Sequence, residues 1–314
     1  LFEIVQRIFG IEVTPVTDMS VWHPDVTTYL IRRQGVSLAR FYFDLYARAK
    51  KRGGAWMADC RCRRQDPAHG LTLPVAFLTC NFAPPVNDQP ALLSHDDVVT
   101  LFHEFGHGLH HMLTQVDCAS VSGINGVAWD AVELPSQFLE NWCWDPDALN
   151  LISGQVDTGE PLPLALLDKM LQARNFQSGM QMVRQLEFAL FDFRLHNEFD
   201  GQPETLRTIL DEVRAAVSVT PISETNRFQN GFSHIFGDVM GYAAGYYSYK
   251  WAEVLSADAF SKFKEDGIFN RQTGERFLTT VLEQGGARDA LELFIDFRGR
   301  APSITPLLQQ EGIL

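Results

Sequence analysis

Residues 94–113 read SHDDVVTLFHEFGHGLHHML, and their apolar members recur at the three- and four-residue spacing of a helix. Ser94 and Asp97 resemble a capping box, with Asp in place of the usual Glu or Gln, and predict that this helix begins there. Further helices are predicted over about 164–199, 203–217, 242–263 and 277–297. The first ninety residues indicate mixed α and β structure. The sequence therefore predicts a mainly α fold with a small β-sheet (α+β).

Two short runs in the first part of the chain are predicted strands. Residues 41–46 (FYFDLY) and 73–78 (LPVAFL) are rich in aromatic and β-branched side chains and are bounded by turn residues. The basic run between them, residues 50–54 (KKRGG), is interpreted as a solvated turn. Because Pro74 cannot donate a ladder hydrogen bond, we expect the second strand to lie at a sheet edge. Its free edge, with Val75 and Phe77, would then pair with an extended peptide.

The amino-acid composition limits the kinds of binding partner and the cellular compartment that we expect for this chain. The 314 residues include 39 acidic and 26 basic side chains, a net charge of −13, which argues against nucleic acid and anionic membranes as partners. The five cysteines are too scattered for a disulfide framework and are predicted to be free thiols. No apolar run approaches the roughly 20 residues of a membrane span, and no signal peptide is recognised. We therefore expect a cytoplasmic monomer.

The motif His103-Glu104-Phe105-Gly106-His107 carries the chemistry. Two histidines four residues apart lie on one face of a helix, so both imidazoles can reach a single metal ion. Glu104 lies beside them and can reach a water molecule at the metal. Zinc lowers the pKa of such a water to about 7, and a carboxylate then removes its proton. The motif thus predicts zinc-dependent hydrolysis, with Glu104 as the general base.

A catalytic zinc site needs a third protein ligand. The H-x-x-G-x-x-H continuation is absent after His107, and His110 and His111 are interpreted as structural residues. Glu133 follows His107 at a distance that allows a loop and a returning helix. By spacing alone it competes with Asp130 and Glu140, so the residues by themselves leave the third ligand open.

Several longer stretches resemble the M3 family of metallopeptidases. They are residues 102–111 (FHEFGHGLHH), 129–137 (WDAVELPSQ), 140–142 (ENW), 22–26 (WHPDV), 41–48 (FYFDLYAR), 51–57 (KRGGAWM) and 245–249 (GYYSY). The resemblance implies one Zn²⁺ ion held by His103, His107 and Glu133, with Asp130 orienting an imidazole. It implies a zincin-like catalytic lobe over residues 1–314, with a mixed α/β part over about 1–90 and a helical part with the zinc site over about 91–314. The helical N-terminal half of the family is expected to be absent.

Tyr242, Tyr246 and Tyr249 are spaced as one face of a helix, which by itself is typical of an aromatic core stripe. The resemblance implies instead that Tyr249 and Tyr242 donate to the oxyanion of the intermediate, that Tyr246 contacts the substrate and that His234 is a further donor. Residues 237–241 (GDVMG) depart from the family pattern, with two additional residues between His234 and Tyr242.

Together, these features predict a zinc-dependent endopeptidase that cleaves internal bonds of short unstructured peptides. Two alternatives stay open. One is a dipeptidyl carboxypeptidase of the same family. The other is a catalytically silent fragment that binds zinc or peptides.

Overall fold

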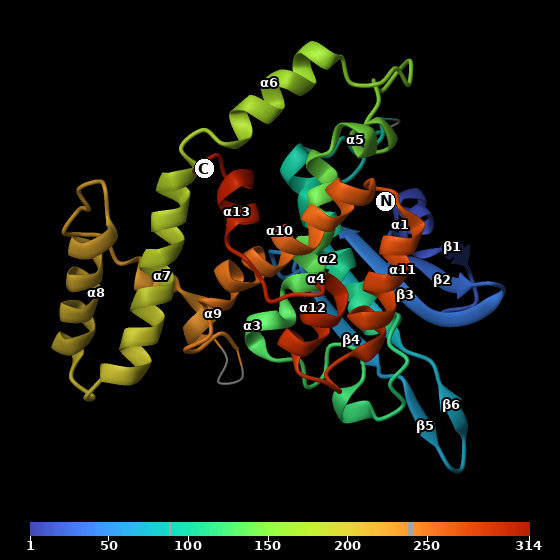
Figure 1. Cartoon of the computed structure of the whole chain (residues 1–314), viewed down its shortest axis with the longest axis horizontal. Coiled ribbons are helices and arrows are strands. Elements are labelled where there is room, and N and C mark those ends of the chain that lie inside the picture. Colours follow the sequence, from blue (N-terminus) through green and yellow to red (C-terminus); the bar gives the residue numbers. More distant parts are fainter. Residues whose placement is uncertain (88, 238–240) are drawn as a thin grey trace.

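The computed structural model describes residues 1–87, 89–237 and 241–314. Its described part contains a five-stranded mixed sheet with the strand order β1-β2-β3-β7-β4. All neighbours in this sheet are antiparallel except β3 and β7, which are parallel. A separate hairpin of β5 and β6 projects away from the sheet (Figure 1). The strands are β1 (Ile11–Val16), β2 (Thr27–Arg33), β3 (Val36–Tyr46), β4 (Trp56–Arg61), β5 (Arg64–Asp66), β6 (Gly70–Thr72) and β7 (Val75–Phe82).

Both predicted strands exist, but the predicted edge position of the second was wrong. β7 lies between β3 and β4, so Val75 is paired with Arg40 on one side and with Arg61 on the other. Pro74 precedes the strand rather than interrupting it, and its carbonyl accepts a hydrogen bond from the backbone of Arg40. The backbone of β7 is therefore already paired on both sides, and Val75 and Phe77 have no free edge to offer a substrate. The free edge on this side of the sheet belongs to β4.

The helix predicted from Ser94 is α2 (His95–Met112), and the capping box between Ser94 and Asp97 is confirmed. α2 packs against β7 on one side and against α4 on the other. α1 (Phe2–Phe9) buries its apolar face in the same core. The remaining helices of this main body are α3 (Trp129–Val132), α4 (Leu134–Glu140), α5 (Pro146–Ile152), α10 (Ser248–Asp266), α11 (Arg271–Thr280), α12 (Ala290–Arg298) and α13 (Thr305–Gln310), with single 3₁₀ turns η1 (Ala119–Val121), η2 (Asn141–Trp144) and η4 (Leu282–Gln284).

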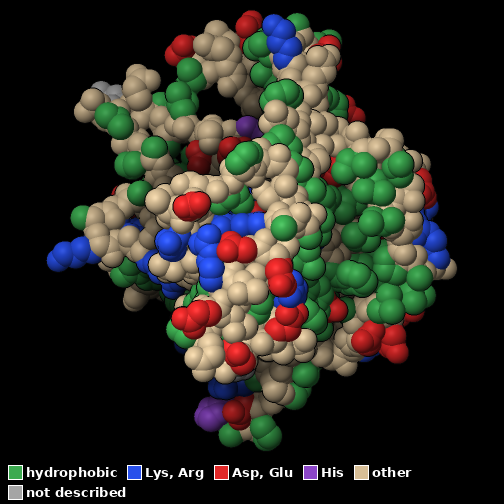
Figure 2. Space-filling view, turned by 90° about the vertical axis from the view of Figure 1, so that its left-hand side faces the viewer, with side chains coloured by type: hydrophobic (Ala, Val, Ile, Leu, Met, Phe, Trp, Pro, Cys, Tyr) green, Lys and Arg blue, Asp and Glu red, His purple; other side chains and the backbone are tan. Residues whose placement is uncertain are grey.

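Two helices, α7 (Ser178–Glu198) and α8 (Pro203–Val217), extend to one side of this body, and α6 (Leu164–Arg174) runs across its top between α5 and α7 (Figure 1). A single helix over 164–199 was predicted, but the chain breaks before α7, where Gln177 adopts a φ of 57°. α7 and α8 share a second, smaller core with η3 (Phe228–Gly231) and α9 (Ser233–Phe236). Figure 2 looks onto this side and shows basic side chains beside acidic ones. Arg194, for example, pairs with Glu198 and Glu212.

Two other helix predictions need correction. α10 begins only at Ser248, so Tyr242 and Tyr246 precede it and the three tyrosines do not share one helix face. The predicted helix over 277–297 is divided between α11 and α12. The fold class, mainly α with a small sheet, is confirmed, and the five cysteines are free as predicted. Among the described residues, no helix combines the length and the apolar character that a bilayer span requires.

Candidate metal centre

Three side chains from two segments meet at one point of the main body. His103 and His107 lie one turn apart on α2, and Glu133 lies between α3 and α4. Oε2 of Glu133 is 3.2 Å from Nε2 of His103 and 3.1 Å from Nε2 of His107. Among the described residues, these three form the group of His, Cys, Asp and Glu side chains whose ligand atoms all lie within 4.8 Å of one another. The structure thus brings together the three residues that the resemblance implied as ligands.

A glycine between the two histidines permits this meeting. A Cβ atom at Gly106 would lie 2.4 Å from the carbonyl oxygen of Pro135 and 2.6 Å from Cα of Ser136. Because Gly106 carries no side chain, α2 and α4 can approach backbone to backbone. Glu133 lies at the start of α4, so the close approach carries its carboxylate to the histidines. Ser136 then fixes that carboxylate through a hydrogen bond of 3.1 Å from its hydroxyl.

The donor set fits a zinc ion. Zinc binds imidazole nitrogen and carboxylate oxygen at about 2.0–2.2 Å, so two ligand atoms of a tetrahedral site lie roughly 3.3 Å apart. The two distances from Glu133 to the histidines are close to this value. Burial opposes the ionisation of Glu133, but its contacts with His103 and His107 lower the pKa of this carboxyl well below its ordinary value. Glu133 is therefore an anion, as a metal ligand must be.

The carboxylate that contacts an imidazole in the structure is that of Glu140, whereas the resemblance implied Asp130 in this position. Oε1 of Glu140 lies 2.6 Å from Nδ1 of His103, on the side of the ring opposite to the metal-facing nitrogen. In the described part of the chain, no hydrogen bond is found between Asp130, which lies on α3, and either histidine. Glu140 follows Glu133 by two helical turns, so both carboxylates face α2 from the same side of α4.

Glu104 lies next to the first histidine and is 6% exposed. Burial raises the pKa of its carboxyl, while the charges of His103 and His107 oppose this rise. A carboxylate with a raised pKa is a stronger base, which suits proton abstraction near neutral pH. The α2 segment that carries Glu104 packs on β7 and on the edge strand β4. A backbone hydrogen bond from Met57 of β4 reaches the carboxyl of Glu104, so this side chain lies against the edge strand of the sheet.

The tyrosines and His234 form an aromatic group over the carboxylate of Glu133. The hydroxyl of Tyr242 donates a short hydrogen bond to Oε1 of Glu133, and its ring stacks on Tyr249 at 4.9 Å. Tyr246 lies 5.2 Å from Tyr249, and the exposed ring of His234 lies about 6 Å from all three tyrosines. Burial raises the pKa of each of the three phenols, so all three remain hydrogen-bond donors. Of the segment 237–241, residues 238–240 lie outside the described residues.

Residues 1–313 match the family model described as "Peptidase family M3".

The chain belongs to peptidase family M3.

Among its relatives, this M3 chain is 57% identical over 316 residues to "Oligopeptidase A" of Escherichia coli (strain K12) and 37% identical over 318 residues to "Dipeptidyl carboxypeptidase" of the same organism. Both alignments cover the whole chain but 46% of the relative, so the chain spans about half the length of these proteins. Its fold resembles the solved structure "PZ PEPTIDASE A with inhibitor 2", with a TM-score of 0.58, 15% identity and coverage of 86% of this chain and 43% of that one.

The M3 chain positions its tyrosines with a residue that the sequence did not single out. Asp192 lies on α7 and is fully buried. Its Oδ1 accepts a hydrogen bond from the backbone N–H of Ala244, and its Oδ2 accepts one from that of Tyr246, each at 2.9 Å. Ala244 adopts a φ of 56°, which an L-residue rarely does without support. Asp192 thus holds the turn that carries Tyr242 and Tyr246.

His110 and His111, the two histidines that follow the motif on α2, are buried in the interior. His111 is buried and its Nε2 lies 2.9 Å from the carbonyl oxygen of Arg61 at the end of β4. His110 is 3% exposed, and burial lowers its pKa to about 3, so it is a neutral side chain of the interior. Neither belongs to the metal-ligand group. This agrees with the prediction that they are not ligands.

Proposed function

We propose that this M3 chain carries the catalytic centre of a zinc-dependent peptidase that hydrolyses internal bonds of short unstructured peptides. The observation that carries the proposal is the position of Glu133 between His103 and His107 at distances that suit zinc. The higher identity to oligopeptidase A than to dipeptidyl carboxypeptidase favours cleavage of internal bonds over removal of C-terminal dipeptides.

In such sites zinc lowers the pKa of a water molecule and polarises the scissile carbonyl. Glu104 would accept the proton of the attacking water and later deliver it to the leaving amine. Tyr249 would donate to the oxyanion that develops on the carbonyl, since its phenol stays protonated and lies beside the metal ligands. Tyr242 would hold Glu133 in the ligand position through its hydroxyl and would donate to the oxyanion when that bond is released. Glu140 would keep His103 oriented.

The substrate backbone would bind along β4 rather than along β7. The outer edge of β4 (Trp56–Arg61) is unpaired in the sheet described here, and Glu104 lies on the helix that packs against it. An extended peptide that adds to this edge would present its carbonyl groups to the metal centre. The peptide must be unstructured, because only an extended segment can form this ladder.

The test replaces Glu104 by Gln and follows both zinc content and cleavage of an internally quenched fluorogenic peptide. We expect E104Q to retain about one zinc ion per chain and to lose turnover by several orders of magnitude. E204Q, at a glutamate on the exposed face of α8, is the matched control and should cleave as the original chain does. Cleavage by E104Q at the normal rate would refute the mechanism.

Two further measurements separate the alternatives. Turnover that a chelator abolishes and added zinc restores would exclude a silent zinc- or peptide-binding fragment. Mass spectrometry of the products would separate the two peptidase activities. Internal cleavage of a peptide with an amidated C-terminus supports the oligopeptidase, whereas stepwise release of dipeptides from free C-termini alone supports a dipeptidyl carboxypeptidase.

A further inference from the structure

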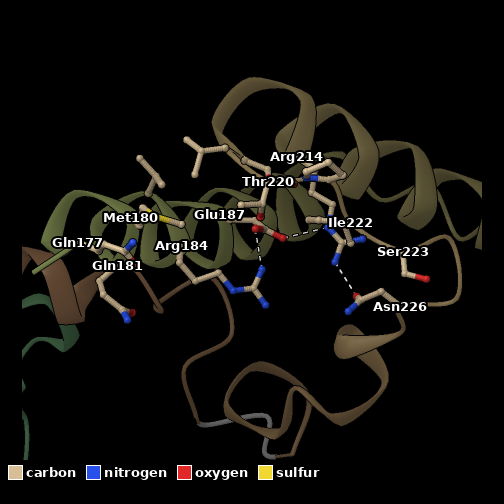
Figure 3. Close-up of a pocket in the computed structure, with 14 residues that line it drawn as sticks. Gln177, Met180, Gln181, Arg184, Glu187, Arg214, Thr220, Ile222, Ser223 and Asn226 are labelled. Atoms are coloured by element: carbon tan, nitrogen blue, oxygen red, sulfur yellow. Dashed lines mark hydrogen bonds and ion pairs between the residues drawn. The ribbon is translucent and has the colours of Figure 1, made fainter.

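A second polar cavity lies on the α7–α8 side of the molecule. It encloses about 440 Å³ between the first three turns of α7, the C-terminal part of α8 and the segment 218–226. Figure 3 shows that Arg184 and Arg214 approach from opposite helices and meet at Glu187, between α7 and the segment that follows α8. None of these residues is used in the metal centre.

The cavity carries one positive charge in excess. Glu187, whose side chain is 3% exposed, is shared by two guanidinium groups, at 2.6 Å from Nη1 of Arg184 and 3.0 Å from Nε of Arg214. Among the described residues that line the cavity, the charged side chains are those of Arg184, Arg214 and Glu187, so two cations face one anion. Arg214 is 8% exposed, donates a hydrogen bond to the amide oxygen of Asn226 at 2.7 Å and lies 5.2 Å from the ring of Phe228. A partly buried positive charge on a chain of net charge −13 favours an anionic ligand.

Arg184 is the donor that can reach such a ligand. Its side chain is 38% exposed, and its guanidinium lies flat against Phe188 at 4.2 Å and near Phe228 at 5.1 Å. A guanidinium carries five N–H donors, and the contact with Glu187 leaves others directed toward the cavity. The planar group suits the bidentate recognition of a carboxylate. The N-terminal turns of α7 line the same cavity, and a helix N-terminus also favours negative charge.

A continuous series of aromatic contacts joins this cavity to the metal centre. Arg184 lies on Phe188, Phe188 contacts Tyr246, Tyr246 contacts Tyr249, and Tyr249 stacks on Tyr242, in steps of 4.2, 5.8, 5.2 and 4.9 Å. The hydroxyl of Tyr246 also bonds Gln185, the neighbour of Arg184, at 3.0 Å. The steps set an upper limit of about 20 Å on the distance from Arg184 to Tyr242, and an extended peptide spans about 3.4 Å per residue, so about six residues or fewer would bridge it.

We propose that Arg184, supported by Glu187 and Arg214, binds the C-terminal carboxylate of a peptide whose scissile bond lies at the metal centre. The ligand class is a peptide with a free carboxylate a few residues beyond the cleaved bond. Such an anchor would favour short peptides, since only they place their C-terminus at this distance. The inference rests on the proposed function only in taking the ligand to be a substrate peptide.

The test measures binding without turnover. Fluorescence anisotropy on the full chain compares three labelled heptapeptides of one sequence: a free acid, a C-terminal amide, and an amide whose last residue is Glu. We expect the free acid to bind about tenfold more tightly than the amide, as for one charge-assisted hydrogen-bonded contact. In R184Q the two affinities should become equal, and R184K should restore part of the difference. R194Q, on the same helix but outside the cavity, is the matched control and should retain the full difference.

Equal binding of acid and amide by the original chain would overturn the proposal. So would an unchanged ratio in R184Q, or no binding of the free acid at millimolar concentration. An amide that regains affinity through its Glu side chain would show that the site takes a carboxylate, but not the C-terminal one, and would also contradict the proposal as stated. Because no step requires hydrolysis, loss of peptidase activity leaves the outcome readable, and a failure here leaves the proposed activity intact.

Discussion

Gly106 faces Pro135 across the contact of α2 and α4 so closely that a Cβ atom at position 106 would lie 2.4 Å from the carbonyl oxygen of Pro135. In a helix without such a contact, replacing glycine by alanine stabilises the protein by about 1 kcal/mol, so a loss of stability in G106A would have to come from the contact with α4. We expect G106A to lower the free energy of unfolding by about 2 kcal/mol or more, because the helices must separate. Zinc affinity should fall with it, since Glu133 moves away from the histidines. Denaturant unfolding and zinc competition with a chelator measure both quantities.

The matched control for this change is G179A. Gly179 also lies in a helix, but a Cβ atom there would meet nothing within 4 Å. This substitution should leave stability unchanged or raise it slightly. If G106A behaved in the same way, the explanation for the glycine between the histidines would be wrong.

Glu140 should matter for metal binding and Asp130 should not. E140Q replaces the carboxylate that lies 2.6 Å from Nδ1 of His103. Loss of such an outer partner typically reduces metal affinity by about 10- to 100-fold, because the ring loses its fixed orientation and part of its basicity. D130N should bind zinc as the original chain does. Zinc dissociation constants of the two variants decide the matter, and equal values for both would contradict the assignment.

Asp192 should affect turnover more than metal binding. In D192N one oxygen is replaced by an amide NH₂, so the side chain can accept only one of the two backbone hydrogen bonds, from Ala244 and Tyr246, that the carboxylate accepts. Hydrogen bonds to charged groups contribute about 1.5–3 kcal/mol, so we expect kcat to fall tenfold or more as the tyrosine turn loses its position. The zinc content should be retained, because the three side chains proposed as ligands lie on other elements and lose at most the hydrogen bond from Tyr242 to Glu133. E198Q on the same helix is the control, and a parallel loss of zinc in D192N would argue for general unfolding.

Asp44 should make stability depend on pH in the acid range. Burial alone would raise the pKa of Asp44, but hydrogen bonds from Arg48, Lys51 and Trp22 lower it well below its ordinary value of 3.8. A carboxyl with a lowered pKa in the folded state stabilises the protein above its unfolded pKa, and this contribution is lost as the pH falls toward the folded value. The stability difference between the original chain and D44N should therefore be constant above about pH 5 and shrink below pH 4.

The size of this difference follows from Lys51. Its side chain is 5% exposed, and D44N would leave it buried without its counter-ion, a loss of about 3–5 kcal/mol at neutral pH. Urea unfolding between pH 3 and pH 7 gives both curves. D18N, at an aspartate paired with Arg40 on the surface, should show a much smaller effect. A difference for D44N that does not change with pH would refute the role of its ionised carboxylate.

Local sequence patterns correctly predicted the structural features that are determined by residues close together in the chain. The capping box at Ser94, the helix that carries His103 and His107, and α8 follow from spacing within one segment. The third ligand did not follow from spacing, because Asp130, Glu133 and Glu140 lie within three helical turns of one another. The choice between them depends on how α4 meets α2, and Gly106 is the local sign of that contact.

What the sequence missed depends on partners far along the chain. β7 is an inner strand because β4 returns to pair with it, and no pattern within residues 73–82 indicates this. The basic run 50–54 was interpreted as a solvated turn, yet Lys51 is buried by Asp44 on β3. The tyrosines leave the helix because Ala244 adopts a left-handed conformation that Asp192, 52 residues earlier, supports. A non-glycine residue in that conformation carries no sequence signal.

The two cores described above divide the site between them. The three side chains proposed as metal ligands lie on elements of the main core, whereas Tyr242 and Tyr246 pack with the smaller cluster of α7, α8 and α9. A small cluster melts at a lower free-energy cost than the whole protein, so warming should release the tyrosines before the ligands. Heat inactivation would then have a reversible first stage in which the protein still carries its ion but no longer turns over.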